Sequence, residues 1–268
     1  MNSQGNYFLL KCTFVKKNSV VRYFIEIAYY GASYCGWQRQ PNALSVQQVV
    51  EEAMTVFLRT SITVVGAGRT DAGVHAKQLF AHFDFNEIKN IPEAIYRINA
   101  LLPNDISVTN ICSVVDDAHA RFHATQRAYE YHIALAKNPF TIGLVHQIHK
   151  RPSIELMNQA ANLLLGHQDF QCFSRSNTDV KTYYCDVKKA TWVSQDNSLL
   201  FTIVADRFLR NMVRAIVGTL LEVGFEKTSL DDFKQILISK DRSNAGASAP
   251  AQGLYLTKVA YPEAIFTT

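Results

Sequence analysis

The stretch VVGAGRTDAGVHA, residues 64–76, holds a cation and a carboxylate on a glycine-rich loop between two predicted β-strands. Apolar residues 62–65 lead into the loop, and residues 79–85 (LFAHFDF) alternate as a half-buried strand does. The glycines permit tight turns and let a ligand approach the backbone closely. The loop therefore presents Arg69 and Asp71 together, either as an ion pair in an ordinary turn or as part of a functional site.

Two phosphate-binding interpretations of this loop fail. A dinucleotide fingerprint needs a third glycine where the chain has Asp71, and a helix where the chain has a strand pattern. A P-loop needs Gly-Lys-Ser/Thr, whereas this loop has Gly-Arg-Thr without the required spacing. Because a strand follows the loop, no helix N-terminus is available to bind a phosphate. What remains is a positioned arginine and aspartate.

Composition sets broad limits on the class of protein. A length of 268 residues suits one large domain or two intimate ones, and 48% hydrophobic residues can form a substantial core. The sequence has no apolar run of about 18 residues and no convincing signal peptide, so we expect no membrane span. The five cysteines are odd in number and lack a Cys-x-x-Cys pair, which favours a reduced, cytoplasmic location. A net charge of +4 permits a nucleic-acid partner without requiring one.

The first part of the chain predicts the order strand–helix–strand–strand–helix–strand, which is that of a ferredoxin-like unit. Ser45 and Gln48 form a capping-box pattern before the first helix, and Pro92 suits the first turn of the second. The predicted elements are a strand at 23–29, a helix at 46–57, strands at 62–65 and 79–85, a helix at 92–102, and strands at 106–115 and 128–136.

The second part loosely repeats this element order without a repeat in the sequence itself. Ser153 and Ser229 are predicted to cap two of its helices. The predicted elements are a helix at 156–165 ended by Gly166, strands at 185–193 and 199–205, a helix at 208–223, a helix after Ser229, and a strand at 253–259. We expect an N-terminal extension at 1–21, an α/β half at 22–145 with the loop that carries Arg69 and Asp71, and a C-terminal α/β half at 146–268 with the arginine-bearing helix.

The predicted helix at 208–223 is apolar around most of its circumference, which is typical of a buried helix. We nevertheless expect Arg207, Arg210 and Arg214 to project from it. A guanidinium at a buried site needs an anionic partner or several acceptors. One of these arginines could pair with Asp71, or it could reach solvent or pair with a structural acid.

A second cluster, at 118–131, interleaves basic and aromatic residues. Arginine can contact phosphates, and both arginine and aromatic rings can stack on bases. An ordinary strand edge with surface charges is the alternative. His119 and His123 lack the further ligands that a zinc site needs, so no metal is expected there.

Six segments carry a resemblance to a known family: YYGASYCGWQRQ (29–40), GAGRTDAGVHA (66–76), HARFHAT (119–125), RAYEY (127–131), FLRNMVRAIVG (208–218) and GLYL (253–256). Taken in order, these segments resemble the TruA family of tRNA pseudouridine synthases. The resemblance covers nearly the whole chain after the N-terminal extension, and several matching segments are far more specific than one motif.

The resemblance implies an α+β fold of two ferredoxin-like (RRM-like) halves, with a continuous, mainly antiparallel sheet flanked by helices and a central RNA-binding cleft. It implies an intramolecular isomerase that converts uridine to pseudouridine in the tRNA anticodon stem-loop, at tRNA nucleotides 38, 39 and 40. It also implies a homodimer. The reaction needs neither a redox change nor external energy, so no cofactor or metal is expected.

The resemblance also assigns roles to single residues. Asp71 is the catalytic residue, Arg69 acts in base extrusion, Tyr129 stacks on the target base and so binds substrate, and Arg214 pairs with Asp71. The tRNA-binding residues form two segments, of which the first matches better: Ala118, His119, Ala120, Arg121 and Phe122, then Asp179, Val180, Lys181, Thr182 and Tyr183.

Two other functions compete with this hypothesis. One is the same reaction on another RNA or another tRNA position, and the other is a catalytically silent tRNA-binding protein. The intact set of Arg69, Asp71, Tyr129 and Arg214 argues against the second. Three chemical roles suit Asp71: attack on the base, attack on C1′, or removal of the C2′ proton.

Overall fold

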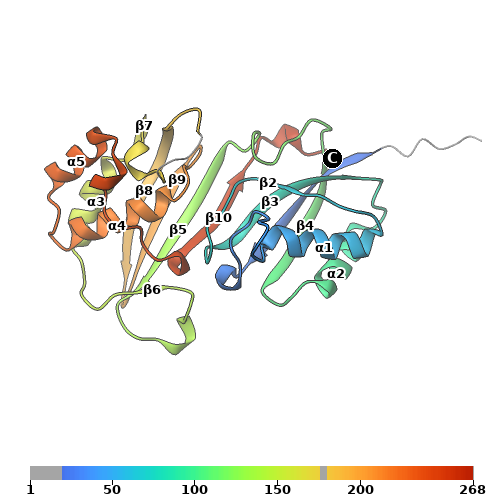
Figure 1. Ribbon diagram of the computed structural model, residues 1–268, viewed down its shortest axis with the longest axis horizontal. Helices are drawn as coiled ribbons and strands as arrows, with labels where there is room; N and C mark the ends of the chain where they lie inside the picture. Colours follow the sequence, from blue (N-terminus) through green and yellow to red (C-terminus); the bar gives the residue numbers. More distant parts are fainter. Residues whose placement is uncertain (1–19, 176–179, 268) are drawn as a thin grey trace, which may run out of the picture.

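Ten strands form a single sheet in the computed structural model, which describes residues 20–175 and 180–267 (Figure 1). The order along the sheet is β4-β1-β3-β10-β5-β9-β8-β7, with β2 added to β3 and β6 added to β5. The pairings are antiparallel except for β10 with β3 and β5 with β6, so the predicted mainly antiparallel sheet is confirmed. The strands are β1 (Val21–Tyr29), β2 (Val65–Gly66), β3 (His75–Phe85), β4 (Ile106–Val114), β5 (Gln126–Ala134), β6 (His146–Gln147), β7 (Gly166–Asp169), β8 (Tyr184–Gln195), β9 (Ser198–Ala205) and β10 (Leu254–Ala260).

Local capping chemistry fixes where several helices begin. The side chains of Ser45 and Ser153 accept hydrogen bonds from the backbone three residues on, and Ser229 and Asp232 cap each other reciprocally. No described helix is both long and apolar enough to cross a membrane. The α-helices of the described residues are α1 (Val46–Leu58), α2 (Ile91–Leu101), α3 (Ile154–Asn162), α4 (Met212–Gly224) and α5 (Leu230–Ser239).

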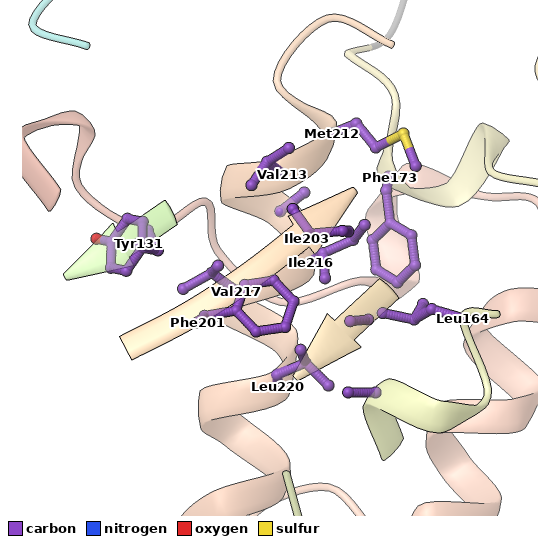
Figure 2. Close-up of a cluster of buried hydrophobic side chains, with 14 of the residues drawn as sticks. Tyr131, Leu164, Phe173, Phe201, Ile203, Met212, Val213, Ile216, Val217 and Leu220 are labelled. Carbon is purple, nitrogen blue, oxygen red and sulfur yellow. The ribbon is translucent and has the colours of Figure 1, made fainter. Parts of the chain in front are cut away.

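Two hydrophobic clusters cover the two ends of the sheet. Helices α1 and α2 lie at one end and α3, α4 and α5 at the other (Figure 1). Figure 2 shows the second cluster, in which Phe201 and Ile203 of β9 lie against Ile216 and Leu220 of α4. All four side chains are fully buried, so α4 is anchored firmly against the sheet.

The last strand, β10, joins the two ends. It lies between β3 and β5, where Tyr255 pairs with His75 on one side and Leu256 pairs with Tyr129 on the other. Tyr129 packs against both hydrophobic clusters. The return of the chain to the middle of the sheet brings the start of β3 close to the centre of β5, although these segments are far apart in the sequence.

Several element boundaries differ from the predicted ones. The predicted strand at 62–65 is only Val65–Gly66, because the backbone N–H of Val64 donates to the buried Glu51 carboxylate, 3.1 Å away, rather than to a strand. The predicted helix at 156–165 is α3, which starts at Ile154 and ends at Asn162, and Gly166 opens β7 instead of ending the helix. Strands β6 and β7 were not predicted, because two and four residues carry too little periodicity.

The helix predicted at 208–223 begins only at Met212. Asn211 adopts the left-handed conformation, with φ of 66°, and the Arg210 carbonyl accepts a hydrogen bond from the backbone N–H of Arg175. That carbonyl is therefore used between segments rather than within a helix. The prediction that Arg207 and Arg210 project from this helix is wrong, and Arg214 alone of the three lies on it.

Candidate active site

The loop at 67–74 is held against the segment at 29–37 by buried polar contacts. The Thr70 hydroxyl lies 2.8 Å from the Tyr29 hydroxyl and accepts a hydrogen bond from the Trp37 backbone at 3.1 Å. Gly36 has a φ of +105°, and a Cβ there would lie 2.2 Å from the Thr70 carbonyl oxygen. Because Asp71 directly follows a residue fixed in this way, its backbone position is defined before any substrate binds.

Asp71 and Arg214 form an ion pair between this loop and α4. The Arg214 Nη1 lies 3.5 Å from Asp71 Oδ2, and the two side chains are 22% and 26% exposed. Arg214 Nε also donates to the Ala249 carbonyl at 2.7 Å, which fixes the guanidinium plane. Within the described residues the Asp71 carboxylate has no other hydrogen bond. One of its oxygens thus remains available for chemistry, next to a fixed cation.

Tyr129 lies in the middle of β5 and meets the same site. Its ring contacts Phe208 edge-on, with 5.1 Å between centroids. Burial raises the pKa of Tyr129 to about 12; Arg127 opposes this shift, and the charge of Asp71 adds to it. The hydroxyl is therefore protonated at neutral pH, and it makes no hydrogen bond in the part of the chain that the structure describes. Tyr131, two residues on, is fully buried in the core.

Arg69 differs from the other residues of this group. Its side chain is exposed, and among residues 20–175 and 180–267 it forms neither a hydrogen bond nor an ion pair. The structure therefore brings Asp71, Arg214 and Tyr129 together and leaves Arg69 projecting from the same loop into solvent.

The first predicted RNA-binding segment is an internally bonded turn. The backbone N–H groups of Arg121 and Phe122 both point at His119 Nδ1, at 3.1 and 3.4 Å. Arg121 and Phe122 are exposed, and the Arg121 guanidinium lies 5.5 Å from the Phe122 ring centre. Ala118 and Ala120 are fully buried, so their side chains support this turn from within.

The second predicted segment is described only from Val180 onward, because Asp179 lies outside the described residues. Lys181 is exposed, whereas the Thr182 hydroxyl accepts the Tyr184 backbone N–H at 3.2 Å. Tyr183 packs against the core, and its carbonyl accepts the Phe170 backbone N–H. Lys181 is thus the exposed cation of this segment.

Two buried side chains that hold this region were missed by sequence reasoning. The Glu51 carboxylate receives the Val64 backbone N–H and the Gln47 amide, and it pairs with Arg39 at 3.2 Å. His82 Nδ1 accepts the backbone N–H of Ala120 at 3.2 Å. A glutamate on an apolar helix face and a histidine within an apolar strand were the only signals in the sequence. Among the described residues, no group of three or more His, Cys, Asp or Glu side chains could hold a metal ion.

We expect acidification to destabilise the turn at 118–122 through His82. Burial, assisted by His119 and Arg22, lowers the pKa of His82 from 6.5 to about 4. Between these values the unfolded chain binds a proton that the folded chain does not, so the free energy of unfolding falls as the pH is lowered from 6.5 to about 4. One histidine contributes at most about 1.4 kcal/mol per pH unit.

Urea unfolding of the wild type and of His82→Gln between pH 7 and pH 4 measures this contribution. The variant should show a shallower loss of stability. The loss should not vanish, because burial also lowers the pKa of His75. Equal slopes for the two proteins would show that His82 is not a source of acid sensitivity.

Comparisons with known proteins identify the family to which the chain belongs. A family model described as tRNA pseudouridine synthase matches residues 160–262. The tRNA pseudouridine synthase A of Bacteroides fragilis is 50% identical over 250 residues, covering 92% of this chain and 99% of the relative. The protein of the same name from Porphyromonas gingivalis is 50% identical over 254 residues, covering 92% and 100%. The one from Francisella philomiragia is 37% identical over 246 residues, covering 91% and 95%. The chain therefore belongs to the tRNA pseudouridine synthase A family, which is a family of isomerases.

Proposed function

We propose that this enzyme isomerises uridine to pseudouridine in the anticodon stem-loop of tRNA, at nucleotides 38, 39 and 40, with Asp71 as the catalytic residue. The observation that carries the proposal is the ion pair of Asp71 with Arg214 beside the Tyr129 ring. A partly buried carboxylate that keeps a fixed counter-ion and a free oxygen suits a nucleophile or a base. The positions within the tRNA follow from the resemblance.

The reaction itself indicates what each residue must do. Converting uridine to pseudouridine breaks the C1′–N1 bond, turns the base and rejoins it through C5. The base must first leave the stack, at a cost of a few kcal/mol, and the exposed Arg69 is suited to fill the space that it vacates. Tyr129 would stack on the flipped base. Asp71 would then attack the base or C1′, or remove the C2′ proton.

The tRNA would be held by residues of the two segments. The half-buried His119 and the exposed Arg121 and Phe122 offer a cation and two rings in contact, and the exposed Lys181 offers a second cation. We infer that two copies of the chain form a homodimer whose cleft accepts the anticodon arm in the cytoplasm. The described cysteines, Cys35, Cys112, Cys172 and Cys185, are free thiols, which suits a reduced compartment.

We also infer that the chain is organised as an extension at 1–21 and two ferredoxin-like halves, 22–145 and 146–268, around a central cleft. The order β1–α1–β2–β3–α2–β4 and the sheet order β4-β1-β3, with β2 on β3, support this for the first half. The extension lies outside the described residues except for its last two positions, and β1 already begins at Val21.

Mapping of pseudouridine in total tRNA tests the proposed function. A strain that lacks the gene should lose pseudouridine at nucleotides 38, 39 and 40, and the wild-type gene should restore it. Loss at a different tRNA position or in another RNA would favour the alternative target. Unchanged pseudouridine throughout the RNA, together with tRNA binding by the purified chain, would favour the catalytically silent binder.

We expect Arg121→Ala to weaken tRNA binding and to flatten its salt dependence. A cation that contacts a phosphate releases a counter-ion, so its loss should lower the slope of log K against log salt by somewhat less than one. Filter binding between 50 and 300 mM salt measures the slope. Arg151→Ala, which removes a cation from the β8–β9 hairpin region, is the control. An unchanged slope for Arg121→Ala would place Arg121 off the RNA path.

A further inference from the structure

Arg127 has an unusual environment for a partly buried cation. Its guanidinium is bonded to backbone carbonyl oxygens and to no carboxylate of the described residues. Nη1 donates to Asp206 at 2.7 Å and to Ala124 at 3.3 Å, and Nη2 donates to Arg121 at 2.7 Å and to Ala67 at 3.1 Å. All four Nη protons are thereby used. Burial lowers the pKa of Arg127, which agrees with a cation surrounded by dipoles instead of an opposite charge.

The four carbonyls belong to three segments around the candidate site. Ala67 lies at the start of the catalytic loop, two residues before Arg69. Arg121 lies in the turn proposed to bind tRNA, and Ala124 follows that turn by two residues. Asp206 follows the last residue of β9 and leads to Phe208, whose ring meets Tyr129.

The position of Arg127 on β5 explains its reach. Side chains two residues apart on a strand point to the same face, so Arg127 and Tyr129 lie on one face of the sheet. Arg127 therefore occupies the site's own face. The two Nη groups of Arg127 thus connect segments that lie around the candidate site.

We propose that Arg127 is a positioning residue for the isomerisation, which fixes the segment at 118–125, including the tRNA-binding turn at 118–122, and the β9–α4 connection relative to the catalytic loop. This inference rests on the proposed function of that loop. A guanidinium is needed for this role because its two Nη groups lie apart and donate in different directions, so that they reach carbonyls of separate segments. A lysine keeps the charge but offers three donors from one point, so it cannot hold all of these carbonyls.

Arg127→Lys should lower the single-turnover rate of pseudouridine formation by about 10- to 100-fold, because a shift of the loop by about 1 Å is enough for a loss of that order. The Kd for tRNA should change less than about threefold, since the exposed cations remain. Arg127→Met should lower the rate at least as much. Arg151→Lys is the matched control, because Arg151 also ties segments together, through the Asp196 carbonyl at 2.6 Å and the Ser194 hydroxyl at 3.0 Å, but away from the site. Its rate should equal that of the wild type.

Temperature separates positioning from a general role in stability. The rates are compared at the same interval below the Tm of each protein. A deficit of the Arg127→Lys rate that persists at this matched interval supports the proposal. A folded Arg127→Lys protein with the wild-type rate, or a deficit that disappears at the matched interval, would overturn it.

Native-state hydrogen exchange of the unchanged chain tests the same idea without a variant. If the Arg127 side chain holds both segments together, the amides of 67–74 and 118–125 should open with the same free energy and the same dependence on denaturant. Independent opening of the two segments would overturn the proposal even if the Arg127 variants failed to fold. Absence of pseudouridine formation by the wild type would reject the proposed function, and this exchange comparison would still decide whether Arg127 couples the segments.

Discussion

Asp71→Asn should abolish pseudouridine formation while leaving tRNA binding intact. Asparagine keeps the size of the side chain but cannot supply the anion that a nucleophile or base requires, so the single-turnover rate should fall to background. The exposed cations that would bind phosphate are unchanged, and the loss of one negative charge should leave affinity equal or slightly higher. The measurement is tRNA binding, thermal melting and single-turnover product formation on one protein preparation.

A matched control separates the carboxylate's chemistry from the loss of an ion pair. Asp84 forms two hydrogen bonds of 2.7 and 2.8 Å with Arg22, away from the catalytic loop. Asp84→Asn removes a closer ion pair than that of Asp71 and should leave the rate unchanged. A folded Asp71→Asn protein that binds tRNA and still forms pseudouridine at the wild-type rate would remove Asp71 from the mechanism. A fall in melting temperature, binding and rate together would indicate a structural carboxylate.

Arg214→Met should lower the single-turnover rate by about two orders of magnitude or more. The change approximately preserves the volume of the side-chain stem but removes the fixed charge 3.5 Å from Asp71 Oδ2, and preorganised charges at a reacting group contribute effects of this size. Arg214→Lys restores a charge without the fork and should recover part of the rate. Binding of tRNA should change much less than the rate.

The appropriate control for Arg214 is Arg242. Arg242 donates to the Ala245 carbonyl at 3.1 Å and to the Ser248 hydroxyl at 3.0 Å, and so holds the same loop whose Ala249 carbonyl binds Arg214. Arg242→Met tests loss of that loop's support without loss of the cation beside Asp71, and it should affect melting more than the rate. An Arg214→Met protein with lower stability and a normal rate would make Arg214 a packing residue only.

Local sequence signals predicted strands and helix starts well where a single kind of interaction determines the structure. The alternating apolar residues of β1 are a strand because one face meets the core. Ser45, Ser153 and Ser229 begin helices because each side chain satisfies a backbone N–H that the helix leaves free. Gln48, however, donates to Glu52 and does not complete the predicted capping box.

Where local sequence signals were ambiguous, long-range contacts determined where an element begins and which strands pair. The sequence from 208 onward is as apolar as a helix requires, yet the Arg210 carbonyl is bound by the Arg175 N–H, and α4 starts four residues later than predicted, at Met212. The position of β10 between β3 and β5 could not be predicted from the sequence either, since the pairing partners of a strand depend on the whole sheet and not on the strand's own residues.

The candidate site divides in the same way. The sequence by itself placed Arg69 and Asp71 on one glycine-rich loop, because their spacing and the glycines are local properties. From the residues alone it could not choose among Arg207, Arg210 and Arg214; the resemblance pointed to Arg214, and the tertiary structure places only that side chain against Asp71. The sequence also did not predict the hydrogen bonds of Arg127, because their acceptors are backbone carbonyls, which every residue carries. Which carbonyls converge on one guanidinium is a property of the folded chain, and only the tertiary structure could decide it.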